Sequence, residues 1–252
     1  MDEGLLKRLI KHIFAMSITT TNIEVIRFVR DQISDASNMP QSTAVFSDRL
    51  VYESLRSSRA ALLQRKIIEK EPINHENYQT ISCIPLREVD VVECPCAPRS
   101  GCTFRVTEWD LPTPLGKLHS VSSIDGSINY SYVEWDKFNR KINGRRAHTS
   151  NSAYFTTKNT KRGIRLYLYN DIHKEMVSVT SVFADPIKIY NYPNCDGSVE
   201  ECIDYLQLPF PVDPDLLGTI YEASFDLLRQ RAPTEDKLQN ESDDARSQTP
   251  IV

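Results

Sequence analysis

Apolar residues recur at helical spacing along the first part of the chain. Residues 4–16 hold an apolar stripe between basic side chains, which predicts a short amphipathic helix. The capping residues Thr19–Asn22 precede a second predicted helix, which the polar run at 34–43 ends. We expect the first helix to pack on its own domain or on a neighbouring subunit rather than on a membrane, because it is short and has no aromatic-rich face.

A longer helix is predicted to begin at Ser47-Asp48, which can cap it, and to end near Lys70 ahead of Pro72. Its buried stripe is expected to contain Val51, Leu55, Ser58 and Leu62. Its opposite face carries basic residues at near-helical spacing, namely Arg49, Arg56, Arg59 and Lys66. That face could contact phosphates or an acidic partner, or it could be a solvated surface on which Glu53 pairs with Arg49. Residues 1–76 are therefore predicted to form an N-terminal helical part.

From Tyr78 to Tyr190 the pattern changes to short β-branched and aromatic runs separated by Pro, Gly, Asn and Asp. This spacing predicts roughly six to eight antiparallel strands. The runs are VDVVEC, CTFRVTEW, KLHSVSSI, INYSYVEW, AYFTTK, IRLYLYN and MVSVTSVF. Asp125-Gly126 and Asn170-Asp171 are the expected tight turns. We assign residues 77–192 to this β-rich part.

The closing helix has the clearest start signal in the chain. The last strand run stops at Asp185-Pro186, and Asp213 is the expected helix cap, with Pro214 in the first helical position and Asp215 in the first turn. Two adjacent apolar stripes follow, made of Leu216, Ile220, Ala223 and Leu227 and of Leu217, Tyr221 and Leu228. Because so broad an apolar face must be covered, we expect residues 193–232 to return to the N-terminal helices. The acidic residues 233–252 are predicted to be disordered.

The predicted fold class is therefore α+β, with helices at the N- and C-terminal ends flanking a central antiparallel β-rich region. The chain has only eight glycines and contains neither G-x-G-x-x-G nor a P-loop motif, which argues against both kinds of nucleotide site. Its five histidines are scattered, and it has no H-E-x-x-H or G-x-S-x-G motif. We predict no enzymatic activity, no catalytic residue and no cofactor. The sequence also has no secretory signal and no apolar run of membrane-spanning length.

Six cysteines without an export signal favour reduced thiols over a disulfide framework. The weak candidates for a metal site are Cys83, Cys94, Cys96 and Cys102. Zinc ligands usually come in pairs two to four residues apart, and the C-P-C spacing fits that pattern poorly. We therefore expect these four to be buried or loop thiols, with a disulfide formed after release from the cell as the remaining alternative. Cys195 and Cys202 have no specific spacing.

A basic stretch between residues 137 and 165 contains nine Lys or Arg residues and no Asp or Glu, although the net charge of the chain is −4. Its candidate contact residues are Lys137, Arg140, Lys141, Arg145, Arg146, Lys158, Lys161 and Arg162. Phe138, Tyr154 and Phe155 lie among them, and cations interleaved with aromatic rings suit contact with nucleic acid. An acidic subunit surface would suit the same residues, and a solvated loop would need no partner.

Four sequence segments between residues 81 and 225 have a distinctive combination of residues. They are CPCAPRSGC followed by WDLPTPL, SSIDGSINYSYVEWDKF, LYLYNDIHKEMVSVTSVFADP, and LPFPVDPDLLGTIY. Together they resemble the tail-connector ring proteins that lie next to the portal in crAss-like and other short-tailed bacteriophages.

The resemblance implies a structural virion protein of the tail or neck, assembled in the cytoplasm of a host bacterium. It would be a subunit of a ring below the portal, typically with twelve copies, that lines part of the DNA channel and offers an attachment platform for further tail proteins. Its partners would be further copies of itself, the portal protein, neighbouring tail rings and, non-specifically, the packaged DNA. The alternatives are another virion assembly or accessory protein, or a zinc-containing nucleic-acid-binding protein.

Overall fold

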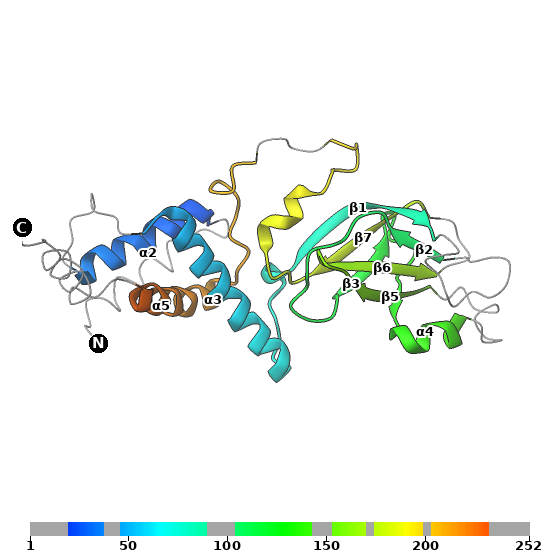
Figure 1. Cartoon of the computed structure of the whole chain (residues 1–252), viewed down its shortest axis with the longest axis horizontal. Helices are drawn as coiled ribbons and strands as arrows, with labels where there is room; N and C mark the ends of the chain where they lie inside the picture. The colour runs from blue at the N-terminus through cyan, green and yellow to red at the C-terminus, as the bar shows by residue number, and fades with distance from the viewer. Residues whose placement is uncertain are drawn as a thin grey trace, which may run out of the picture. The chain divides into compact units, whose positions relative to one another are not determined.

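The chain folds into two compact units, which are considered separately (Figure 1). The structure, a computed structural model, describes residues 20–37, 46–89, 104–142, 153–169, 174–198 and 203–231. The first unit contains the described residues up to Arg59 and those from Pro214 onward, and the second is Ala60–Asp213. The boundary between the two units therefore falls inside one helix and again at the start of another.

Two helices of the first unit begin at the capping residues expected from the sequence. The α2 helix, Asn22–Ser37, is preceded by Thr21, whose backbone N–H donates to the Glu24 carboxylate over 2.9 Å. The α3 helix, Asp48–Glu69, follows Ser47, whose hydroxyl accepts from the backbone N–H of Leu50 over 3.3 Å. Each contact satisfies a backbone donor or adds charge at a helix start, where N–H groups lack an intrahelical acceptor.

The closing helix α5, Pro214–Arg231, packs against the N-terminal helices, as its broad apolar face predicted. The rings of Phe28 in α2 and Tyr221 in α5 lie 4.5 Å apart between centroids. The buried hydroxyl of Ser54 in α3 donates to the carbonyl of Ser224 over 3.1 Å. Helices from both ends of the chain thus share one core.

The second unit is built on a seven-stranded sheet with the order β3-β7-β1-β2-β6-β5-β4. The strands are β1 Gln79–Glu88, β2 Phe104–Thr107, β3 Ser120–Ser123, β4 Ser131–Tyr132, β5 Tyr154–Asn159, β6 Ile164–Tyr169 and β7 Met176–Ser181. All strand pairs are antiparallel except β4 with β5. The predicted α+β class is confirmed, with a mostly antiparallel sheet whose strands lie between the N- and C-terminal helices in the sequence.

A single stretch of chain brings the two edges of this sheet together. The backbone N–H of Tyr130 donates to the carbonyl of Val121 in β3 over 2.9 Å. The next N–H, from Ser131, donates to Ala153 at the start of β5 over 2.9 Å, and that of Val133 donates to Phe155 over 2.8 Å. Because consecutive residues pair with opposite edges, the sheet is nearly closed on itself.

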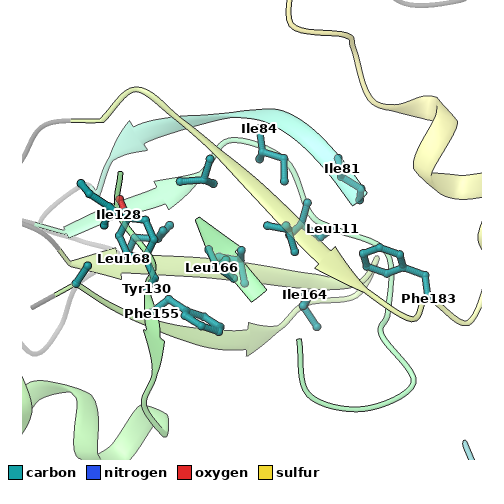
Figure 2. Packing of buried hydrophobic residues seen from close by; sticks show 14 residues of the cluster. Ile81, Ile84, Leu111, Ile128, Tyr130, Phe155, Ile164, Leu166, Leu168 and Phe183 are labelled. Atoms are coloured by element: carbon teal, nitrogen blue, oxygen red, sulfur yellow. The ribbon is translucent and has the colours of Figure 1, made fainter. Parts of the chain in front are cut away.

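Alternate residues of β6 point into two different cores, as expected for a strand covered on both faces. Leu166 and Leu168 belong to the larger cluster, which includes Phe155 and Phe183 (Figure 2). Tyr167 and Tyr169 belong to a second cluster on the other face. The short helix α4, Trp135–Ile142, covers that face, where the Phe138 ring lies 5.3 Å from that of Phe104.

Several sequence predictions need correction within this unit. The strand β1, Gln79–Glu88, was not expected and lies ahead of the first predicted run, VDVVEC, which after Val89 lies outside the described residues. The run INYSYVEW yields only the two-residue β4 before the chain turns into α4. Asp185 ends no strand but caps the 3₁₀ helix η3, Pro186–Asn191. A second 3₁₀ helix, η2, spans His75–Asn77.

The Asp125-Gly126 turn is present, with Gly126 at a φ of +67°. The expected Asn170-Asp171 turn, the helix at 4–16 and the acidic segment 233–252 lie outside the described residues.

Candidate partner-contact surface

Only some cations of the basic stretch lie close to one another on the surface. Lys158 lies in the exposed last part of β5, and Lys161 and Arg162 are exposed in the turn that follows it. No carboxylate of the described residues forms an ion pair with any of the three side chains. They concentrate positive charge at the end of the β5–β6 hairpin.

An exposed aromatic pair lies beside this hairpin, along the edge where β4 meets β5. Trp135 is 39% exposed and its ring meets that of Tyr167 edge-on at 5.0 Å, while the Lys158 ammonium lies 5.5 Å from the Trp135 ring centroid. Tyr132 is 40% exposed, and the Lys117 ammonium likewise lies 5.5 Å from the centroid of its ring. A cation over an aromatic face is attracted by the ring quadrupole, so each lysine is held close to the surface. We call Tyr132, Trp135, Lys117 and Lys158 the edge surface.

The hairpin beside the edge surface is held by Asp110. One oxygen of its carboxylate accepts from the Thr160 hydroxyl over 2.9 Å, and the other accepts from Arg165 Nε over 2.9 Å. A Cβ on Gly163 would come within 1.9 Å of the Leu111 carbonyl oxygen, so only glycine allows the two backbones to approach this closely. Lys161 and Arg162 therefore project from a fixed turn, whereas Arg165 is neutralised by Asp110.

Asp110 also anchors the chain that leaves the sheet towards α5. The Tyr192 hydroxyl donates to the Asp110 carbonyl, and the Tyr192 ring lies 6.4 Å from that of Trp109. Burial, followed by the negative charge of Asp110, raises the pKa of Tyr192 to about 12. The tyrosine is thus a neutral hydrogen-bond donor over the physiological pH range.

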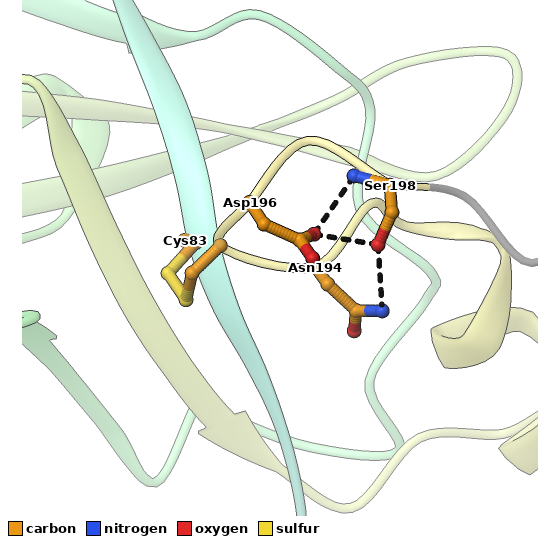
Figure 3. The surroundings of a disulfide bond; sticks show 5 residues. Cys83, Asn194, Asp196 and Ser198 are labelled. Carbon is orange, nitrogen blue, oxygen red and sulfur yellow. Dashed lines mark hydrogen bonds between the residues drawn. A yellow bond between two sulfur atoms is a disulfide. The ribbon is translucent and has the colours of Figure 1, made fainter.

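The cysteine predictions are partly wrong, because Cys83 and Cys195 form a disulfide (Figure 3). This bond removes Cys83 from the candidate metal ligands. Cys94, Cys96 and Cys102 lie outside the described residues. In the described part of the chain, no group of three His, Cys, Asp or Glu residues could hold a metal ion.

A family model for phage tail ring protein 2 matches residues 24–245. The chain belongs to this family of crAss-like phage tail ring proteins. The resemblance seen in the sequence is thereby confirmed. No curated protein matches the chain.

As a tail ring protein, the chain is a structural component of the virion and not an enzyme. A ring is built from repeated copies, so membership also implies a homo-oligomer. In the described residues, no helix is both long and apolar enough to span a membrane.

The basic face expected on α3 of the ring protein is only partly present. Arg49 is exposed, but Arg56 pairs with Glu53, which was expected to pair with Arg49. Arg59 is 0% exposed, so it offers no charge at the surface of this chain. Its position explains the difference, because Arg59 is one helical turn after the buried Leu55 and follows Ser58 directly. Lys66 is half-buried, and its Nζ lies 3.8 Å from a carboxylate oxygen of Glu71.

The remaining predicted contact residues say less about a partner-contact surface. Lys137 on α4 pairs with Glu134. Arg140 and Lys141 continue the same helix, and Arg145 and Arg146 lie outside the described residues.

The aromatic residues of the ring protein's edge surface were not those expected. Phe138 and Phe155 are each 3% exposed and belong to the two cores, and Tyr154 is partly buried. Trp135 and Tyr132 are exposed instead, and Lys117 lies outside the basic stretch altogether. The alternation of side chains along β5 could have indicated that Phe155 faces inward.

Proposed function

We propose that this tail ring protein forms a closed ring of twelve copies in the head-to-tail connector, below the portal. The observation that supports the proposal best is the family match over residues 24–245, which includes most of α2, all of the described helices α3 and α5, and the whole sheet. A closed ring requires a head-to-tail interface in which two different surfaces of the same chain meet.

The edge surface is our candidate for one side of a protein interface. Aromatic side chains and arginine are enriched at the centres of protein interfaces, and Trp135 and Tyr132 combine a large apolar area with few rotatable bonds. Both are exposed in the single chain. A neighbouring copy, the portal or a further tail protein that buried them would turn the ring into an attachment platform.

Passage of DNA through the ring is the second part of the proposal. Lys161 and Arg162 have no carboxylate partner among the described residues, and Arg49 is likewise exposed without one. Lysine and arginine contacts to phosphates depend on charge and not on base sequence, so DNA can slide past them. The nine Lys or Arg residues between residues 137 and 165, with no Asp or Glu among them, support this role.

Electron cryomicroscopy of the assembled particle tests the proposal directly. We expect twelve copies of the chain in one ring below the portal, with cations of the basic stretch facing the channel. Native mass spectrometry of the ring released from particles gives an independent copy number. A ring elsewhere in the tail would contradict the connector position, and a different copy number would contradict the twelvefold symmetry.

A further inference from the structure

The disulfide joins two positions that enclose almost the entire sheet. Cys83 lies in β1 and Cys195 lies beyond η3, 112 residues later, with their Cα atoms 5.0 Å apart. Strands β2 to β7 all lie between them in the sequence. The bond therefore closes a covalent loop around six of the seven strands.

Cys83 is held in a special backbone position. The register of β1 against β7 shifts between Ile81 and Ile84, which marks a bulge, and Cys83 has a φ of +57°. A left-handed backbone is unfavourable for a residue with a Cβ, so surrounding contacts must maintain it. The Cys83 side chain is only 4% exposed, which places this end of the bond inside the unit.

Cys195, by contrast, lies in an exposed turn. The backbone N–H and hydroxyl of Ser198 both donate to the Asp196 carboxylate, and Gly197 has a φ of +78°. The turn thus has hydrogen bonds of its own, and a small thiol or disulfide in solution can approach Cys195. The exposed thiol can react first and the buried one can resolve the bond.

We propose that Cys83 and Cys195 form a redox-controlled disulfide, which we call the staple. The two thiols are reduced in the cytoplasm and joined in the released particle, where the bond carries tension past the sheet. The timing rests on assembly in the cytoplasm of a host bacterium, which the resemblance to tail ring proteins implies and where cellular reductants keep thiols reduced. The pairing itself and its mechanical effect do not depend on the ring.

The chemistry is a thiol–disulfide exchange with a small disulfide such as oxidised glutathione. The Cys195 thiolate attacks one sulfur of the oxidant, forms a mixed disulfide and releases one thiolate, which takes up a proton. The Cys83 thiolate then attacks the Cys195 sulfur and releases the second. The two cysteines lose two protons and two electrons in total, and the oxidant gains both.

The mechanical consequence follows from the position of the bond. When the ends of the chain are pulled apart, force passes from Cys83 to Cys195 through the disulfide. The residues between them cannot be extended, even if the sheet unfolds. A component of a tail that transmits force would keep its sheet segment tethered in this way.

Thiol trapping tests the pairing and its timing. Full-length protein is expressed in a reducing bacterial cytoplasm and alkylated at lysis under denaturing conditions, which expose the buried Cys83, and a second sample is first exposed to oxidised glutathione. Peptide mass spectrometry should find Cys83 and Cys195 alkylated in the first sample and joined to each other in the second. A pair already joined at lysis would overturn the timing. No joined pair after oxidation, or joining of either cysteine to a different one, would overturn the staple.

Single-molecule stretching of the full chain from its ends tests the mechanical part. The total extension of the oxidised chain should be shorter than that of the reduced chain by roughly 370–400 Å, the extended length of 112 residues. Cys195→Ser should show the longer extension under both conditions. Cys202→Ser, which leaves both partners in place, should behave as the wild type. Equal extensions for the oxidised and reduced wild type would overturn the proposal, and this comparison needs no variant to fold.

Discussion

Gly163 is the residue on which the β5–β6 turn depends most directly. Replacing it with alanine would place a Cβ 1.9 Å from the Leu111 carbonyl oxygen, so one of the two backbones must move. We expect Gly163→Ala to lower the free energy of unfolding of the sheet unit by about 2–3 kcal/mol.

Gly126→Ala is the matched control, since a Cβ there meets no atom within 4 Å and only the positive φ opposes it. Both tryptophans, Trp109 and Trp135, lie in the sheet unit, so urea unfolding followed by their fluorescence measures the difference. Equal losses in the two variants would contradict the proposed close approach.

Tyr192 gives the sheet unit a specific pH dependence. Its pKa of about 12 in the folded chain exceeds the value of about 10 for an unfolded tyrosine, so the folded state retains the proton longer. Its contribution is therefore complete below about pH 10 and decreases as pH rises towards 12. We expect a loss on the order of 1 kcal/mol over this range, after a discount because the ring is only partly buried.

The variant Tyr192→Phe isolates that contribution from those of the other tyrosines. It lacks the hydrogen bond to the Asp110 carbonyl, which should cost about 1 kcal/mol at neutral pH. Between pH 10 and 12 the gap between the variant and the wild type should narrow. A gap that stays constant in urea titrations at several pH values would mean that the Tyr192 pKa is not raised.

At the scale of elements, α4 depends on one buried aromatic contact. Phe138 is 3% exposed and its ring meets that of Phe104, whereas its neighbour Lys137 is 66% exposed in its side chain. Phe138→Ala should destabilise the sheet unit by about 3 kcal/mol, because the removed ring leaves a cavity between α4 and the sheet. Lys137→Ala should change stability by less than about 0.5 kcal/mol. Urea unfolding measures both, and hydrogen exchange of the α4 amides shows whether the helix loosens first. Similar effects for the two substitutions would mean that Phe138 does not anchor the helix.

The same elements show which parts of the fold could be predicted. The start of α5 is encoded locally, by Asp213 ahead of Pro214, and α3 likewise follows Ser47. By contrast, β1 was missed because the bulge at Cys83 breaks its alternation of buried and exposed residues, and the bulge depends on a partner strand far along the chain. The partner of Cys83 was missed for a similar reason, since residues 112 positions apart meet only once the sheet has formed.

At the scale of the whole molecule, the number of unpaired cations in the basic stretch determines how strongly that stretch can bind one partner. The fold neutralises Arg165 with Asp110 and pairs Lys137 with Glu134. Among the residues of the basic stretch whose side chains the structure describes, this leaves Lys158, Lys161 and Arg162 without a carboxylate partner. Sequence alone could predict the excess of charge but not this selection, because the neutralising acids come from other segments. We therefore expect these three residues to account for most of the DNA affinity that the described part of the basic stretch provides.

Measuring DNA affinity against salt concentration tests that expectation. The assembled ring, with its copy number checked by native mass spectrometry, is titrated onto labelled duplex DNA at several salt concentrations. Each lost phosphate contact should reduce the slope of log K against log salt by about 0.9 per chain in contact. Lys158→Gln, Lys161→Gln and Arg162→Gln combined should therefore weaken binding and flatten the slope, with no change in base preference. Arg65→Gln is the matched control, since Arg65 is exposed but paired with Glu69 over 2.9 Å. If the triple variant kept the wild-type slope while the ring stayed intact, the hairpin would not contact DNA, and its cations would be assigned to a protein partner at the edge surface.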